Sequence, residues 1–311
     1  MKKYALFMCI ILGLGFSLSA QETPDAALKD TSYWTSGGVA SIGFSNTGYS
    51  TYWQAGALPS QAVSGRLNLF ANYKKKSQWT NELALAYGLL RQGREGVFLK
   101  NEDRIEFTSK YGAPLTEKLL IAAQLNFRSQ FDEGFEFNPA FPTNEDSATL
   151  ISRFLSPAYL NFGVGIDYQP SENLSFYYTP VNAKITIVAD ENLRPNFIPQ
   201  EITTGPARFE LGSNLTVKLK QEVVKNVLFQ STANFFANYL ENFGNIDVNW
   251  ETLTTMKVND FLAVSFATNL IYDDDILFAI DRNGDGTPDG KGPRTQFQHI
   301  LTVGLTLNFK E

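Results

Sequence analysis

The chain has 311 residues, and 26 Lys and Arg against 32 Asp and Glu give a formal net charge of −6 at pH 7. An acidic chain without a basic stripe argues against nucleic acid as a partner. Aromatic residues make up 14%, with 25 Phe and 13 Tyr, a content expected of strands that face lipid.

The first residues have the features of a secretory signal. Lys2 and Lys3 precede an apolar run over 4–16, and small residues follow it over 17–21. The run is too short to span a membrane, so we expect residues 1–20 to be removed on export. Loss of the two lysines makes the mature chain more acidic, with a net charge of −8.

The mature chain is expected to contain no cysteine, because Cys9 lies inside the signal. This excludes a disulfide framework and thiolate chemistry. The stretch 21–35 is polar and is predicted to be a periplasmic lead segment. No other stretch approaches 18 apolar residues, so no transmembrane helix is expected.

Twelve segments of roughly 10 residues alternate between apolar and polar positions and are bounded by turn residues, the pattern of membrane β-strands. They predict strands at 36–46, 62–75, 78–91, 98–111, 116–131, 156–169, 172–187, 205–220, 223–239, 245–258, 260–273 and 296–309.

The predicted connections alternate in length. Those after even-numbered strands are tight, whereas four of the others are long, at 47–61, 132–155, 188–204 and 274–295. Outer-membrane barrels have short periplasmic turns and long outer loops, and an even strand count leaves both termini in the periplasm.

The last strand separates two kinds of side chain. From Leu301 to Phe309 the odd positions are apolar, while Thr302, Gly304, Thr306 and Asn308 are small or polar. Alternation alone fits a membrane barrel and a soluble secreted β-sandwich equally well. The signal and the turn pattern favour a single antiparallel outer-membrane β-barrel of about twelve strands over 36–311, with the sandwich as the alternative.

Six segments of the chain carry a resemblance to a known family. They are Trp53–Gly56, Ser77–Asn81, Asp103–Glu106, Ile151–Tyr159, Thr179–Thr186 and Ile271–Asp275. They resemble an uncharacterised Bacteroidota-type family of outer-membrane β-barrels, known only as a domain of unknown function. In the first segment Ala57 follows Gly56, where the family form has a second glycine. The resemblance supports the barrel and implies no catalytic residues.

The predicted inner face of the second to fifth strands carries a cluster of charges. Two interpretations remain open: a salt-bridged plug that fills a narrow lumen, or a selective lining for a small polar solute. Simple folding about the turns places Glu82 near Glu106, and Lys100 near Arg128. The cluster comprises Arg66, Glu82, Lys100, Glu102, Arg104, Glu106 and Arg128.

The long connection before the last strand contains a loop with hard oxygen donors at alternate positions, as calcium prefers. Position 12 of the loop is Gly292, so the bidentate glutamate of an EF-hand is missing. The alternative is a polar turn without a metal. The candidate calcium ligands are Asp281, Asn283, Asp285, Thr287 and Asp289.

His299 is the only histidine and falls on the predicted lipid side. Catalysis would need a nucleophile and an orienting group beside it, and no Gly-x-Ser-x-Gly motif occurs. The leading hypothesis is therefore a non-enzymatic barrel in contact with membrane lipid. It is either a narrow channel for a small polar solute or an accessory barrel bound to envelope proteins. The alternative is an outer-membrane lipid or peptide hydrolase.

Overall fold

The computed structural model describes residues 33–47, 59–93, 96–137, 148–198, 204–241, 244–283, 287 and 289–310. The predicted signal, 1–20, and most of the predicted lead segment, 21–35, lie outside these residues.

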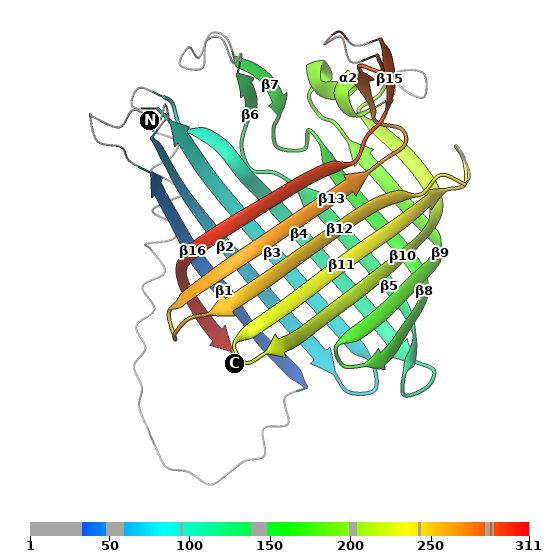
Figure 1. Cartoon of the computed structure of the whole chain (residues 1–311). Coiled ribbons are helices and arrows are strands. Elements are labelled where there is room, and N and C mark those ends of the chain that lie inside the picture. The colour runs from blue at the N-terminus through cyan, green and yellow to red at the C-terminus, as the bar shows by residue number, and fades with distance from the viewer. Residues whose placement is uncertain are drawn as a thin grey trace. The chain divides into compact units, whose positions relative to one another are not determined.

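Twelve antiparallel strands close into one barrel, in which the last strand pairs with the first (Figure 1). All twelve correspond to predicted segments, and no boundary differs by more than four residues. The barrel strands are β1 (Trp34–Thr47), β2 (Ser60–Lys74), β3 (Gln78–Gln92), β4 (Leu99–Pro114), β5 (Leu119–Ser129), β8 (Ala158–Ser171), β9 (Leu174–Ile187), β10 (Ala207–Val224), β11 (Val227–Asn238), β12 (Asp247–Lys257), β13 (Leu262–Tyr272) and β16 (Gln296–Lys310).

Three long connections contain further elements that the sequence pattern did not predict. All of them lie at one rim of the barrel (Figure 1). They are the hairpin β6 (Gly134–Phe137) and β7 (Ala148–Ser152), the short helices η2 (Glu191–Leu193) and α2 (Arg194–Phe197), and the hairpin β14 (Leu277–Ile280) and β15 (Gly290–Pro293). Within the described residues, no helix has the length and apolar character needed to cross a membrane.

The outside of the barrel is apolar and the inside polar. On β8, Phe162 and Ile166 are 50% and 45% exposed, whereas Asp167 between two outward residues is 1% exposed. A soluble sandwich would bury the apolar face instead, so that alternative is wrong. Lipid cannot satisfy the edges of an open sheet, and here the first strand pairs with the last to close the ring. The predicted transmembrane barrel of twelve strands is confirmed.

Aromatic rings collect outside the barrel at the rim with the short turns. The rings of Trp34 and Trp79 are tilted against each other with their centroids 5.7 Å apart, and Tyr111 and Tyr168 are also exposed. Amphipathic rings at one level suit the headgroup region of a bilayer.

The predicted register of the charged strands was wrong. Glu82 pairs with Thr108 rather than lying opposite Glu106, and Arg128 pairs with Glu106 rather than lying near Lys100. The turn between β4 and β5 lies later than expected, because the Thr116 hydroxyl accepts hydrogen bonds from the backbone N–H groups of two following residues. In the observed register Arg128 therefore lies opposite the acidic Glu106 and not near the basic Lys100.

Strand β9 contains a β-bulge at Thr179-Pro180. Asn214 of β10 pairs with Thr179, but Gly212 pairs with Asn182, so one extra residue is inserted. Proline cannot donate a hydrogen bond and is tolerated inside a sheet mainly at such bulges. The Pro180 carbonyl accepts a hydrogen bond of 2.8 Å from the Tyr239 hydroxyl, on the outside of the barrel. Tyr239 thereby supplies the partner that lipid cannot offer.

We expect Tyr239→Phe to lower the free energy of unfolding by about 1 kcal/mol, since it leaves this carbonyl unpaired. Urea unfolding of the refolded protein in detergent micelles measures the change. Tyr178→Phe is the matched control. Tyr178 is also outward and 47% exposed, and its hydroxyl has no hydrogen-bond partner within the described residues. Equal stability of the two variants would contradict the assigned role.

Candidate functional site

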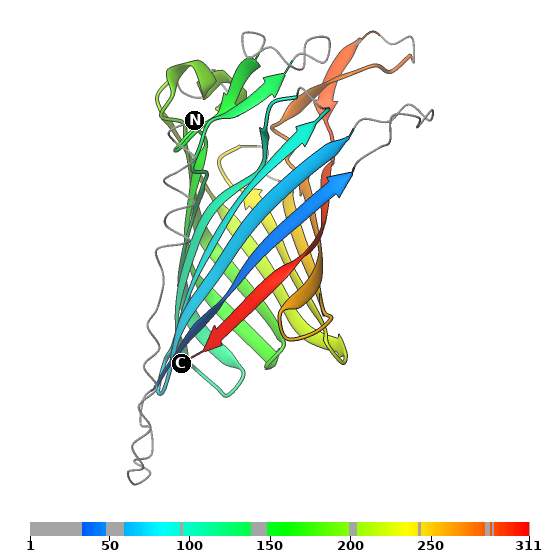
Figure 2. The ribbon, with the colours of Figure 1, turned by 90° about the vertical axis from the view of Figure 1, so that its left-hand side faces the viewer.

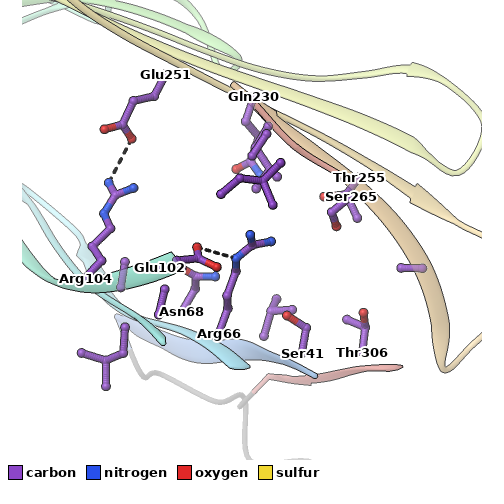
Figure 3. Close-up of a pocket in the computed structure, with 18 of the residues that line it drawn as sticks. Ser41, Arg66, Asn68, Glu102, Arg104, Gln230, Glu251, Thr255, Ser265 and Thr306 are labelled. Atoms are coloured by element: carbon purple, nitrogen blue, oxygen red, sulfur yellow. Dashed lines mark hydrogen bonds and ion pairs between the residues drawn. The ribbon is translucent and has the colours of Figure 1, made fainter. Parts of the chain in front are cut away.

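The interior of the barrel contains a cavity of about 1010 Å³. Its lining runs from the short turns, at Asn226 and Asn259, to the opposite rim, at Gln130 and Ser152. The cavity therefore follows the length of the barrel. Most of its wall comes from β1 to β4, β11 to β13, and β16 (Figure 3).

One wall of the cavity is charged. Arg66 on β2 donates from Nε to the Glu102 carboxylate on β4 at 2.8 Å. Arg104 binds Glu106 on the same strand, and the Asn126 amide donates to Glu106 at 2.9 Å. These side chains point inward because they occupy the polar positions of alternating strands.

Two ion pairs to one carboxylate cross the lumen. Arg104 and Arg128 donate to the two oxygens of Glu251, at 2.9 and 3.1 Å. Figure 3 shows the pair between Arg104 and Glu251. Arg104 lies on β4 and Glu251 on β12, which are six places apart in the ring of twelve strands and therefore face each other. We call Arg104, Arg128 and Glu251 the crossbar. Each is 24–33% exposed, so water reaches it.

A weaker contact crosses the lumen elsewhere. Lys218 on β10 lies 3.6 Å from the carboxylate of Glu82 on β3, and the two side chains are 38% and 59% exposed. Such exposure on inward-facing positions indicates a hydrated lumen, in which an ion pair has little strength.

Other parts of the cavity wall are polar but uncharged. Ser41 and Thr306 come from β1 and β16, whereas Gln230, Thr255 and Ser265 come from β11, β12 and β13 (Figure 3). Over its whole lining the cavity has six basic and six acidic side chains. The arrangement offers hydrogen bonds without a net field that would favour one sign of ion.

The remaining side of the lumen is filled by side chains. The Tyr177 hydroxyl donates to the backbone carbonyls of Ala122 and Gly163, and Tyr177 is 2% exposed. Below it, Lys110 pairs with Asp167 at 2.6 Å. Small residues on β5 and β8 make room for the ring, so the lumen is blocked on this side and open only on the other.

A second charge network lies near the rim of the long loops. Arg208, which is 6% exposed, pairs with Glu241 and Asp275 at 2.7 Å each. Lys184 lies 3.4 Å from both Glu210 and Asp247. These groups tie β9 and β10 to loop residues and to β12, outside the cavity lining.

The outer connections form a compact cap over one part of the rim. Val188, Leu193 and Ile198 are almost fully buried and pack together. Arg153, after β7, donates to the Asp190 carboxylate at 2.8 Å. This hydrogen bond holds the pKa of Asp190 below its ordinary value.

The Arg153–Asp190 contact is expected to weaken in acid. An unfolded aspartate titrates near pH 3.9. Because the folded pKa is lower, the contact contributes stability above that pH and loses it as the pH falls through the lowered value. The protection factor of the Asn192 amide, which donates to Asp190, should therefore drop in strong acid. Asp190→Asn should remove this step, and an unchanged step would contradict the assignment.

Six of the seven predicted charges line the cavity: Arg66, Glu82, Lys100, Glu102, Arg104 and Arg128. The seventh, Glu106, is bound by Arg104 and Asn126 beside the lining. Glu82 contacts Lys218 across the lumen. Lys100 binds Asp103 and the carbonyl of Asp132 near the loop rim.

The central residue that the sequence analysis missed is Glu251. It alternates with the outward Trp250, which is 46% exposed, so its inward direction was available from the pattern. Its contact with Arg104, which is 147 residues away in the chain, could be predicted only from the order of the strands in the closed barrel.

The candidate calcium loop joins β14 to β15, and Asp285 lies outside the described residues. Asp289 accepts a hydrogen bond from the backbone N–H of Arg282 at 3.0 Å. Among the residues that the structure describes, no group of three His, Cys, Asp or Glu side chains could hold a metal. Calcium binding by Asp281, Asn283, Asp285, Thr287 and Asp289 stays a prediction.

His299 lies outside the barrel, as the alternation predicted. Its ring is exposed and lies 6.3 and 6.0 Å from the rings of Phe266 and Phe297. Within the described part of the chain, no hydroxyl or carboxylate forms a hydrogen bond with it. The location of His299 does not decide between the non-enzymatic barrel and the hydrolase alternative.

The family model described as "Protein of unknown function (DUF3078)" matches residues 44–135. The match covers the first three of the resembling segments and agrees with a family of unknown function. It does not test the Bacteroidota-type assignment. No curated protein matches the chain.

Solved barrels are similar at low identity. The translocator domain of the autotransporter NalP from Neisseria meningitidis is 8% identical, with a TM-score of 0.39, over 98% of this chain and 95% of that one. The COG4313 outer membrane channel from Pseudomonas putida F1 is 10% identical, with a TM-score of 0.39, over 93% and 100%. The NanC porin is 8% identical, with a TM-score of 0.37, over 87% and 98%.

Proposed function

We propose that this protein is an outer-membrane channel for small, polar solutes without net charge. The observation that carries the proposal is the cavity of about 1010 Å³, whose lining reaches from the short turns to the opposite rim. Spread over a hydrocarbon core of about 30 Å, this volume gives a mean cross-section of roughly 34 Å². A bore of that size suits a solute no larger than a monosaccharide or an amino acid.

Three features support the outer membrane as the location. The sequence predicts an export signal, the barrel exterior is apolar, and the first strand pairs with the last to close the ring. Short turns at one rim and longer connections at the other indicate that the cap lies outside and the short turns lie in the periplasm.

The wall chemistry indicates the class of solute. Equal numbers of acidic and basic side chains give little preference between anions and cations. The hydroxyl and amide groups of the wall can exchange hydrogen bonds with a sugar-like or zwitterionic solute as it moves, and such replaceable bonds permit transit. No catalytic step is part of this proposal.

The experiment is single-channel recording of the refolded, full-length mature protein in a planar bilayer, combined with swelling of liposomes in uncharged sugars. We expect small discrete conductance steps with weak ion selectivity, and swelling with monosaccharides but not with trisaccharides. Repeating both measurements with added calcium or with EDTA tests the predicted calcium loop.

A second candidate is a closed accessory barrel that binds envelope proteins through its outer cap. The crossbar favours it, because ion pairs that span the lumen narrow the open section. A verified folded barrel without conductance or swelling would overturn the channel and support this second role.

A further inference from the structure

The seam that closes the barrel is incomplete. The pairing of β1 with β16 runs from Gly37–Lys310 to Gly43–Gly304 and stops there. On its other side β1 remains paired with β2 up to Thr47, and β16 remains paired with β13 up to Gln296. Both strands therefore continue beyond the last shared pair, and Figure 2 shows them separating towards the loop-side rim.

A glycine pair marks the end of the seam. A Cβ on Gly304 would collide with the carbonyl of Ile42, and a Cβ on Gly43 would collide with the Thr302 side chain. The backbones can approach this closely only without side chains. Glycine at such a position is typical of a bend or of a close backbone approach within a sheet, and here it precedes the divergence.

The separated edges have lipid on their outer side and the cavity of the barrel on their inner side. On the outside, Phe44 and Leu301 are each 65% exposed and Val303 is 51% exposed, so lipid lies against them. On the inside, Gln298 and Ile300 of β16 line the main cavity. Unpaired backbone groups at membrane depth are tolerated where they line a water-filled space, so the opening joins the lumen to the bilayer.

Arg66 stands at this opening. A small recess at the end of the seam is lined by Arg66, Thr302 and Gly304 among others. The Nε of Arg66 donates to Glu102 and Nη1 lies 3.5 Å from the Thr302 hydroxyl. Its Nη2 is buried and has no hydrogen-bond partner among the described residues. The guanidinium therefore keeps an unused donor beside an apolar edge.

We propose that the β1–β16 seam is a lateral portal for an anionic amphiphile with a single acyl chain. The chain would lie against Phe44, Leu301 and Val303, and the anionic headgroup would accept from Arg66 Nη2, an arrangement suited to charge-assisted bonds. This site is independent of axial solute transport, because it opens to the bilayer instead of to either rim.

The first test locks the seam. Continuing the register of the ladder would place Ser45 opposite Thr302, both facing inward. The mature chain is predicted to be free of cysteine, so Ser45→Cys with Thr302→Cys can be joined by a short thiol-reactive linker and checked by mass. Ala40→Cys with Leu307→Cys is the matched control, since these residues already pair in the closed part of the seam and line neither the recess nor the main cavity. The probe is dansyl-undecanoate, titrated by fluorescence in phosphatidylcholine nanodiscs.

We expect the Ser45–Thr302 bridge to weaken probe binding at least tenfold and the Ala40–Leu307 bridge to leave it unchanged. Equal binding by the two bridged proteins would overturn the portal. Planar-bilayer conductance of the same preparations separates the two proposals, because the axial channel should stay open when the seam is locked. A silent barrel that still binds the probe would overturn only the channel.

The second test uses the charge pair and needs no cross-link. Arg66→Gln should weaken probe binding about tenfold, the size expected for loss of one charge-assisted contact. Glu102→Gln should tighten it severalfold, because it frees the Arg66 guanidinium. Lys257→Gln is the control, as it removes the same charge from the cavity lining at the far rim.

A purely structural role for Arg66 predicts weaker binding in both variants of the pair, and that result would overturn the headgroup assignment. Dodecyltrimethylammonium should fail to displace the probe, whereas dodecyl sulfate should displace it. Equal displacement by both detergents would also contradict an anionic site.

Discussion

Replacement of Glu251 by glutamine should raise the single-channel conductance about twofold and shift the selectivity towards anions. The change removes the carboxylate that holds Arg104 and Arg128 across the lumen. The two arginine side chains can then withdraw to their own wall, and their charge is compensated only in part by Glu106. A wider bore with excess positive charge conducts more and favours anions.

The measurement is planar-bilayer recording in a potassium chloride gradient, where the reversal potential reports selectivity. Glu222→Gln is the control, because Glu222 lines the cavity at the short-turn rim without taking part in the crossbar. An unchanged reversal potential in Glu251→Gln would show that the conducting path bypasses the crossbar.

Replacement of Lys110 by methionine should lower the free energy of unfolding by about 3–5 kcal/mol, the usual cost of leaving a buried charge without its partner. Asp167 is 1% exposed, and its carboxylate accepts from Lys110 Nζ at 2.6 Å, from Gln169 and from Ser175. The two neutral donors cannot balance the charge once the ammonium is gone.

Guanidinium unfolding of the refolded barrel in detergent measures this loss. The double variant Lys110→Met with Asp167→Asn should recover most of it, since no charge is then buried. Lys257→Met, which breaks an exposed pair with Asp260, should change stability by no more than about 0.5 kcal/mol. Equal effects of the buried and exposed lysines would contradict the role of Asp167.

The sequence predicted strands and faces well because alternation is a local property. A residue such as Leu305 shows its outward direction through its immediate neighbours, and the tight turns show which segments are adjacent. The register was harder. The offset of six residues between the expected and observed partner of Arg128 arises from the turn at Thr116, where a side-chain hydrogen bond decides how many residues stay outside the strands.

The candidate site was only partly predictable for a different reason. Arg104 and Arg128 could be assigned to the inner face from their own strands. Their joint partner Glu251 comes from the opposite wall, and the choice of opposite wall follows from the number of strands and from closure. The bulge at Pro180 adds to the difficulty, because it reverses the alternation within one strand and directs Tyr177 inward.

Closure between the first and last strands also constrains how the chain folds. Gly43 and Gly304 pair across roughly 260 positions of sequence, whereas every other neighbouring strand in the ring is reached through a much shorter connection. Contacts of such long range form slowly, because the entropy of bringing distant segments together is lost before the contacts contribute stability. The hairpins can assemble one after another, but the ring is completed only after the C-terminal strand has arrived.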